Sequence, residues 1–126
     1  MSTIERPIML VEDDPLLRDA LRLLLEDAGY RVLEAGNAAE ALERSTIDPP
    51  SLILLDLGLP DRPGLEVARI LRARHPTRDT PIVALTGRVG PGERSACIAA
   101  GCNSFLAKPV QPRELLRCVP EFMRLD

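Results

Sequence analysis

Three adjacent carboxylates follow a short apolar run near the start of the chain. Residues 8–11 are Ile-Met-Leu-Val, and Glu12, Asp13 and Asp14 come directly after them. Two like charges about 4 Å apart repel each other by about 4 kcal/mol at a protein surface of effective dielectric ~20. Another group must offset this repulsion, and a bound cation would do so.

Single polar side chains follow three later apolar runs: Asp56, Thr86 and Lys108. Lys108 is the one lysine among 16 basic residues, which indicates a position where a compact ammonium is needed in place of the broad guanidinium fork of arginine. Carboxylates, a hydroxyl and an ammonium in one crevice would bind a hard cation together with an anion. Mg²⁺ fits such a site because it takes oxygen ligands and commonly shares them with a phosphate.

Alternating strands and helices would bring these side chains together. Apolar runs and helical periodicity with cap residues predict five strand–helix repeats. The predicted strands are 8–11, 31–35, 51–55, 81–85 and 104–107, and the predicted helices are 15–28, 37–45, 65–74, one ending near 100 and one beginning near 112. This order predicts an α/β fold, a doubly wound five-stranded parallel sheet with helices on both faces. The carboxyl ends of its strands share one edge, where ligands bind.

Local signals at helix ends refine this prediction. Asp14 stands directly before Pro15 and is expected to cap a helix rather than to bind metal. Asn37 with Glu40 resembles a capping box. Pro120 falls inside the last predicted helix, where it costs about 3 kcal/mol or more unless the helix ends or kinks there.

Composition narrows the function classes. A chain of 126 residues with 45% hydrophobic residues suits one domain over residues 1–126. A net charge of −3 and 2% aromatic residues argue against direct binding of nucleic acid. Membrane spans and signal peptides need longer or differently arranged apolar segments, so we expect no membrane contact and a cytoplasmic location. The three cysteines are expected to be reduced, partly buried thiols.

The spacing of the polar strand ends resembles that of the response regulator receiver domains of two-component systems. That family has an acidic pair after the first strand, an Asp after the third, a Thr or Ser after the fourth and Lys-Pro after the fifth. Asp13, Asp56, Thr86 and Lys108 match this pattern at typical separations of 43, 30 and 22 positions. Pro60, Gly64, Phe105 and Pro109, which in the family usually follows a cis peptide bond, also match.

The resemblance implies a flavodoxin-like receiver fold, similar to single-domain chemotaxis regulators, and a role for each site residue. Asp56 would accept a phosphoryl group from a sensor histidine kinase or a phosphotransfer domain, and Lys108 would contact that group. Mg²⁺ would be held by Asp13, Asp56 and the backbone carbonyl of Gly58, with Glu12 acting through a water. The domain would be regulatory rather than an enzyme, although it promotes its own phosphorylation and dephosphorylation.

The resemblance also implies how the signal is read and ended. Thr86 and Phe105 would switch a surface built from the fourth helix, fifth strand and fifth helix, where a downstream protein binds. Gly58 and Arg88 occupy the positions that influence the lifetime of the phosphoryl group, and we expect Arg88 to shield it. The chain is either a stand-alone regulator or a receiver from a larger protein, such as a hybrid kinase.

Two other functions use similar residues. A degenerate receiver would act only as a protein-binding scaffold, but such proteins tend to lose the acidic pair, the Asp or the Lys. A haloacid-dehalogenase-type phosphatase places its nucleophile after the first strand in a D-x-D pattern, which "EDD" lacks.

Overall fold

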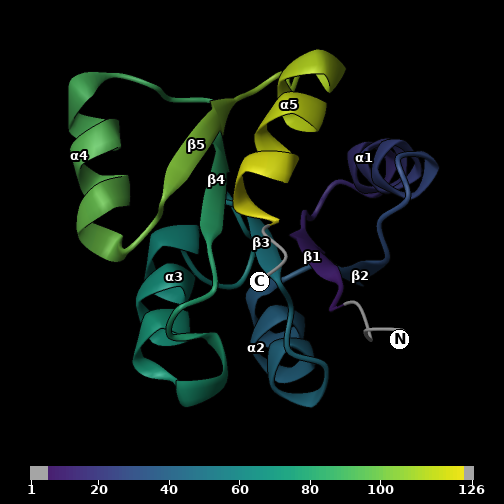
Figure 1. Ribbon diagram of the computed structural model, residues 1–126. Coiled ribbons are helices and arrows are strands. Elements are labelled where there is room, and N and C mark those ends of the chain that lie inside the picture. Colours follow the sequence, from purple (N-terminus) through teal and green to yellow (C-terminus); the bar gives the residue numbers. More distant parts are fainter. Residues whose placement is uncertain (1–5, 124–126) are drawn as a thin grey trace.

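The computed structural model describes residues 6–123, and it contains a five-stranded parallel sheet covered by helices on both faces (Figure 1). The strands are β1 (Ile8–Val11), β2 (Val32–Ala35), β3 (Leu52–Asp56), β4 (Ile82–Thr86) and β5 (Ser104–Ala107). The helices are α1 (Pro15–Asp27), α2 (Ala38–Ile47), α3 (Gly64–Ala73), α4 (Pro91–Ala100) and α5 (Pro112–Phe122), with a short 3₁₀ turn at His75–Thr77. The predicted fold class is confirmed.

The sheet separates two hydrophobic cores. Helices α1 and α5 cover one face and α2, α3 and α4 cover the other. Strands β1, β3 and β4 lie inside the sheet and are completely buried apart from small exposures at Asp56 and Thr86, because both of their faces carry helices. Side chains alternate between the two cores, with Met9 and Val11 on one face and Ile8 and Leu10 on the other.

The strand order β2-β1-β3-β4-β5 places β1 beside β3. The end of β1, which leads into Glu12 and Asp13, therefore lies beside the end of β3, which is Asp56. Strands β4 and β5 continue the sheet from β3, so Thr86 and Lys108 lie along the same edge.

Several predicted boundaries were wrong by one or two residues. Strand β2 begins at Val32 rather than 31, β3 and β4 are each displaced by one residue toward the C-terminus, α2 extends to Ile47 and α3 runs from Gly64 to Ala73. Asp56 and Thr86 are therefore the last residues of their strands, not the residues after them. Their backbones still pair with the neighbouring strands, opposite Leu85 and Ala107, because ladder pairing does not require an apolar side chain.

Helix caps follow the sequence signals with one change. Asp14 Oδ1 accepts hydrogen bonds from the backbone N–H groups of Leu16 (3.0 Å) and Leu17 (3.5 Å), so Asp14 is the expected N-cap. Asn37 caps α2 by accepting from the N–H of Glu40. The carboxylate of Glu40, however, accepts from Gly36 rather than from Asn37, so the predicted capping box is displaced by one residue.

Helix α5 contains Pro120 and ends two residues later. The proline therefore lies inside the last helix, as the sequence indicated, and the helix ends within one turn of it, which limits the cost. Three cysteines, Cys97, Cys102 and Cys118, are buried free thiols. Within residues 6–123, no helix has both the length and the apolar character required to cross a bilayer.

Candidate functional site

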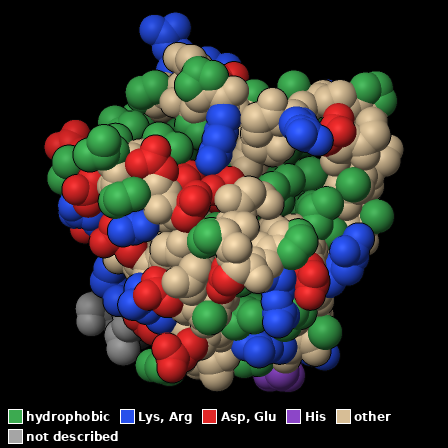
Figure 2. Space-filling view, turned by 180° about the vertical axis from the view of Figure 1, so that it is seen from behind, with side chains coloured by type: hydrophobic (Ala, Val, Ile, Leu, Met, Phe, Trp, Pro, Cys, Tyr) green, Lys and Arg blue, Asp and Glu red, His purple; other side chains and the backbone are tan. Residues whose placement is uncertain are grey.

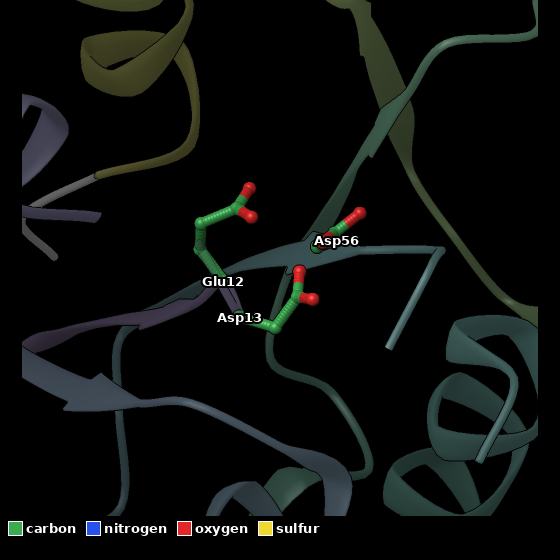
Figure 3. Close-up of side chains that lie close together, drawn as sticks. All are labelled: Glu12, Asp13 and Asp56. Carbon is green, nitrogen blue, oxygen red and sulfur yellow. The ribbon is translucent and has the colours of Figure 1, made fainter. Parts of the chain in front are cut away.

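Three carboxylates converge at the carboxyl edge of the sheet. Glu12 and Asp13 follow β1 and Asp56 ends β3, and ligand oxygens of the three lie within 4.8 Å of one another. Figure 3 shows their side chains projecting from the two adjacent strand ends into one region. Glu12 is 1% exposed and Asp56 is 3% exposed, so both carboxylates are largely removed from water, whereas Asp13 is exposed.

The ammonium of Lys108 lies between two of these carboxylates. Its Nζ is 3.0 Å from Glu12 Oε1 and 3.0 Å from Asp56 Oδ1. The backbone N–H of Lys108 donates to the carbonyl of Thr86 at 2.8 Å, which continues the pairing of β5 with β4. Lys108 therefore offsets part of the repulsion between the carboxylates. The direct ion pair with Glu12 was not predicted, although one lysine beside an acidic triplet could have indicated it.

The two carboxylates that share Lys108 have pKa values displaced in opposite directions. Burial raises the pKa of Glu12 to about 7, despite its bonds to the Asp14 N–H and to Lys108. Burial would also raise the pKa of Asp56, but the Gly58 N–H, the Lys108 ammonium and a hydrogen bond with Asp13 outweigh it and lower that pKa. Asp56 is therefore ionised at neutral pH and available as a nucleophile.

The loop after β3 fixes the Asp56 side chain. The backbone N–H of Gly58 donates to Asp56 Oδ1 at 3.0 Å. The N-terminus of α3 approaches this loop so closely that a Cβ at Gly64 would lie 2.5 Å from Leu57 Cα and 2.6 Å from the Asp56 carbonyl oxygen. Only glycine fits there, so close packing explains why this position, Gly64, matches the glycine of the receiver pattern. In the same loop, Asp61 accepts from the N–H groups of Ala38 and Ala39 at the start of α2.

Thr86 is tied to the loop that follows it. Arg88 donates its backbone N–H to Thr86 Oγ1 at 3.0 Å, and the Thr86 hydroxyl donates to the Arg88 carbonyl at 3.1 Å. The Arg88 side chain is exposed. Any movement of the Thr86 hydroxyl toward Asp56 would therefore either break these bonds or draw the loop with it.

A cleft of about 540 Å³ contains these groups. Its charged and polar walls are Asp13, Asp56, Thr86, Arg88, Glu93 and Lys108. A larger hollow of about 720 Å³ lies beside α2 and is also lined by Asp61, Arg62 and Arg74, which flank α3, but the charged strand ends meet in the smaller one. Glu93, in the first turn of α4, was missed by the sequence analysis. Its place three residues after the helix N-cap marks it as a first-turn acid, but nothing in the sequence shows which way that turn faces.

Phe105 lies on β5 outside the cleft. The ring is half-buried against the core shared with α4, and the guanidinium of Arg94 is 5.0 Å from its centre. The Lys108–Pro109 peptide bond is cis, as expected. The role of Phe105 in switching stays a prediction.

A model of the family described as "Response regulator receiver domain" matches residues 8–119. The chain belongs to the response regulator receiver domain family. Among curated relatives, the polar-differentiation response regulator DivK of Brucella anthropi is 30% identical, over 94% of this chain and 96% of that protein. The chain also spans about half the length of related transcriptional regulators, such as PhoB of Pseudomonas aeruginosa, at 34% identity over 96% of this chain.

Solved structures of receivers have the same architecture. The chemotaxis protein CheY4 of Vibrio cholerae superposes with a TM-score of 0.90 at 28% identity, covering 94% of this chain and 99% of that one. The receiver domain of the sensor histidine kinase PA1611 of Pseudomonas aeruginosa gives a TM-score of 0.86 at 33% identity, covering 95% and 98%. That structure has a magnesium ion coordinated in its active-site cleft.

The acidic edge of this chain suits the same kind of ion. Its donors are carboxylate oxygens from adjacent strand ends, within 4.8 Å of one another, and hard divalent cations prefer such oxygen ligands. One of the donors, Asp13, is exposed, so an ion would have access from solvent.

Proposed function

We propose that this receiver accepts a phosphoryl group on Asp56 from a phosphohistidine of a sensor histidine kinase or a phosphotransfer domain. The observation that supports this most is the state of Asp56, a nearly buried carboxylate with a lowered pKa that is paired with Lys108 at 3.0 Å. An ionised carboxylate held in one orientation is a competent nucleophile toward phosphorus.

The transfer is a displacement at phosphorus. A carboxylate oxygen of Asp56 forms the new O–P bond, and the P–N bond to the imidazole breaks, so that the electron pair stays on the imidazole nitrogen. Such transfers depend on in-line placement and on neutralisation of the phosphoryl oxygens. Lys108 would neutralise one of these oxygens, a role that the contact of its ammonium with Asp56 supports.

Mg²⁺, when bound, would supply most of the remaining neutralisation. We assign its protein ligands to the carboxylates of Asp13 and Asp56 and the backbone carbonyl of Gly58, with Glu12 acting through a water. One oxygen of Glu12 is paired with Lys108. The same residue can therefore position both the ammonium and a metal-bound water.

We further propose that phosphorylation changes the surface formed by α4, β5 and α5, where a downstream protein would bind. The Thr86 hydroxyl exchanges its bonds with Arg88 for one with a phosphoryl oxygen. The loop after β4 then moves with it, and Phe105 turns inward. The phosphoryl group shifts the population between two arrangements of this surface. The domain therefore acts as a regulator, and it ends the signal by hydrolysis of its own aspartyl phosphate.

The experiment is intact mass spectrometry after incubation with Mg²⁺ and acetyl phosphate. The parent protein is expected to gain one phosphoryl group, and Asp56→Asn is expected to gain none while it keeps the same far-ultraviolet circular dichroism. Asp79→Asn, the same change at an exposed position away from the cleft, is the control and should be modified like the parent.

Other outcomes would point elsewhere. An unchanged parent mass would indicate a scaffold, and continuous turnover of the phosphodonor with no modified protein would indicate a phosphatase. Full modification of Asp56→Asn would refute the assignment of Asp56.

A further inference from the structure

The guanidinium of Arg18 reaches from α1 to the backbone beside the acidic cluster. Its Nη1 donates to the carbonyl oxygen of Glu12 at 2.8 Å. Its Nε lies 3.5 Å from Glu34 Oε1 on β2. Arg18 therefore joins three elements, α1, β2 and the end of β1, at the point where the chain leaves β1 to form the acidic turn.

The space around this guanidinium depends on a glycine. A Cβ at Gly36 would lie 3.1 Å from Arg18 Nη1, closer than a side chain normally approaches. The N–H of Gly36 is held by Glu40 Oε1 at 2.8 Å, and the N–H of Glu12 donates to the carbonyl of Ala35 at 3.0 Å. Because Gly36 has no side chain, the turn after β2 leaves room beside the turn after β1, and the guanidinium of Arg18 fills that room.

We infer that Arg18 is a positioning residue for the cation site. By holding the Glu12 carbonyl, it fixes the turn that carries Glu12 and Asp13, so that their carboxylates meet Asp56. Groups that hold metal ligands in place commonly affect metal affinity although they never touch the metal. This inference rests on the proposed function, because it assumes that the three carboxylates bind Mg²⁺.

Electrostatics alone predicts the opposite effect of removing Arg18. A cation near the acidic cluster repels Mg²⁺, so its loss by itself would strengthen Mg²⁺ binding. If the Arg18→Ala protein binds Mg²⁺ more weakly, the cause is lost positioning rather than lost charge. The sign of the change therefore separates the two explanations.

Arg22 offers a matched control. It lies one turn further along α1 and also pairs with Glu34 at 3.5 Å. Its closer partners, Asp19 at 3.1 Å and Glu26 at 2.9 Å, are on α1 itself. Arg22→Ala removes the same charge from the same helix and the same bond to β2, but it leaves the Glu12 carbonyl bonded to Arg18.

The test is isothermal titration of metal-free protein with MgCl₂ at constant ionic strength. We expect Arg18→Ala to weaken Mg²⁺ binding about tenfold, at the low end of effects of residues that hold metal ligands. Arg22→Ala should bind Mg²⁺ as the parent does or slightly more tightly. Arg18→Lys, with one donor nitrogen in place of the three of the guanidinium, can hold either the Glu12 carbonyl or Glu34 and should give an intermediate affinity.

A second measurement needs no metal. The backbone N–H of Asp14 donates to Glu12 Oε2 at 3.1 Å, so its exchange with solvent, followed by NMR, reports whether the acidic turn is fixed. Exchange should be faster in Arg18→Ala than in the parent and in Arg22→Ala. Thermal unfolding of each variant verifies that the fold is retained.

The outcomes distinguish this inference from the proposed function. If the parent binds Mg²⁺ and Arg18→Ala binds it equally or more tightly, Arg18 does not position the site, while the proposed function stands. If Arg18→Ala and Arg22→Ala weaken binding alike, the effect comes from Glu34 or from the helix, and the inference is overturned. If the parent binds no Mg²⁺, the metal site of the proposed function and this inference both fail.

Discussion

Lys108 contacts two carboxylates at the same distance, but their pKa values are shifted in opposite directions. Glu12 and Asp56 each have an oxygen 3.0 Å from its Nζ. For Glu12 burial outweighs the bonds to the Asp14 N–H and Lys108 and the pKa rises, whereas for Asp56 the bonds with the Gly58 N–H, Lys108 and Asp13 outweigh burial and the pKa falls. Each carboxylate accepts one backbone N–H, and the hydrogen bond with Asp13 is the further partner that only Asp56 has, which favours ionisation of Asp56, the proposed nucleophile.

The raised pKa of Glu12 predicts a pH dependence of stability in the metal-free protein. Between its ordinary pKa of 4.5 and its folded pKa of about 7, the folded state holds a proton that the unfolded state has released. The stabilisation from this proton is complete below about pH 4.5 and is lost as the pH rises through 7. Glu12→Gln should remove this loss, a change of roughly 1–3 kcal/mol.

Urea unfolding in EDTA at pH 4.5 and pH 7.5 measures this difference. Glu43→Gln, which removes a carboxyl from an exposed position on α2, corrects for the change in net charge. A Glu12→Gln profile parallel to that of the parent would contradict the prediction.

Arg88 is predicted to lengthen the life of the phosphorylated state. It lines the cleft from the loop after β4, and Gly58, which also lines the cleft, has no side chain to exclude water. A charge-assisted hydrogen bond to the phosphoryl group is worth roughly 1.5–3 kcal/mol, so Arg88→Ala should dephosphorylate about tenfold faster or more. The measurement is loss of the phosphorylated mass after the donor is removed. Arg69→Ala, on the exposed face of α3, is the control. If the phosphorylated Arg88→Ala protein decays no faster than this control, Arg88 does not shield the phosphoryl group.

At the scale of elements, the sequence predicted the order of the five strands and five α-helices and the exact bounds of β1 and β5, but it missed the 3₁₀ turn at His75–Thr77 and the exact ends of several other elements. An apolar run predicts a buried strand, but Asp56 and Thr86 continue the strand pairing after the apolar residues stop. The cap at Asp14 was predictable because it depends on adjacent residues. The bonds from Ala38 and Ala39 to Asp61 were not predicted, because they join segments more than 20 residues apart.

Replacing Pro120 by alanine is predicted to stabilise the protein. It lies inside α5 at an exposed position, where it removes the hydrogen bond to the carbonyl four residues earlier, at Leu116. Because α5 ends two residues later, only part of the roughly 3 kcal/mol cost of an interior proline applies. Pro120→Ala restores this N–H and should raise stability by about 1 kcal/mol, which is about 3–5 °C in the unfolding midpoint for a domain of this size.

Pro112→Ala is the matched control for this prediction. Pro112 is the first residue of the same helix, where a missing N–H costs nothing. Its replacement should give no gain. An equal gain at both positions would show that the effect is not the interior hydrogen bond.

At the scale of the whole molecule, the site is a product of strand order. The sequence indicated that polar residues at strand ends share one edge, but a four-residue apolar strand does not specify its neighbours. Strand β1 pairs with β2 on one side and β3 on the other, and this arrangement places Asp13 beside Asp56. Contacts such as Arg18 with the Glu12 carbonyl depend on how α1 packs over that edge, so sequence patterns could not predict them.

The basic side chains on the surface are almost all arginines, because the chain has a single lysine. Figure 2 shows basic and acidic side chains interspersed over one face of the molecule, and throughout the chain all basic side chains but one are arginines. The single side-chain primary amine is Lys108, which is 26% exposed within the cleft. Reagents that acylate amines therefore have one side-chain target, and it lies beside Asp56, the proposed phosphoacceptor. The extent of acylation at Lys108, measured as added mass, should fall when the cleft is occupied. It therefore reports occupancy of the site without any substitution in the protein.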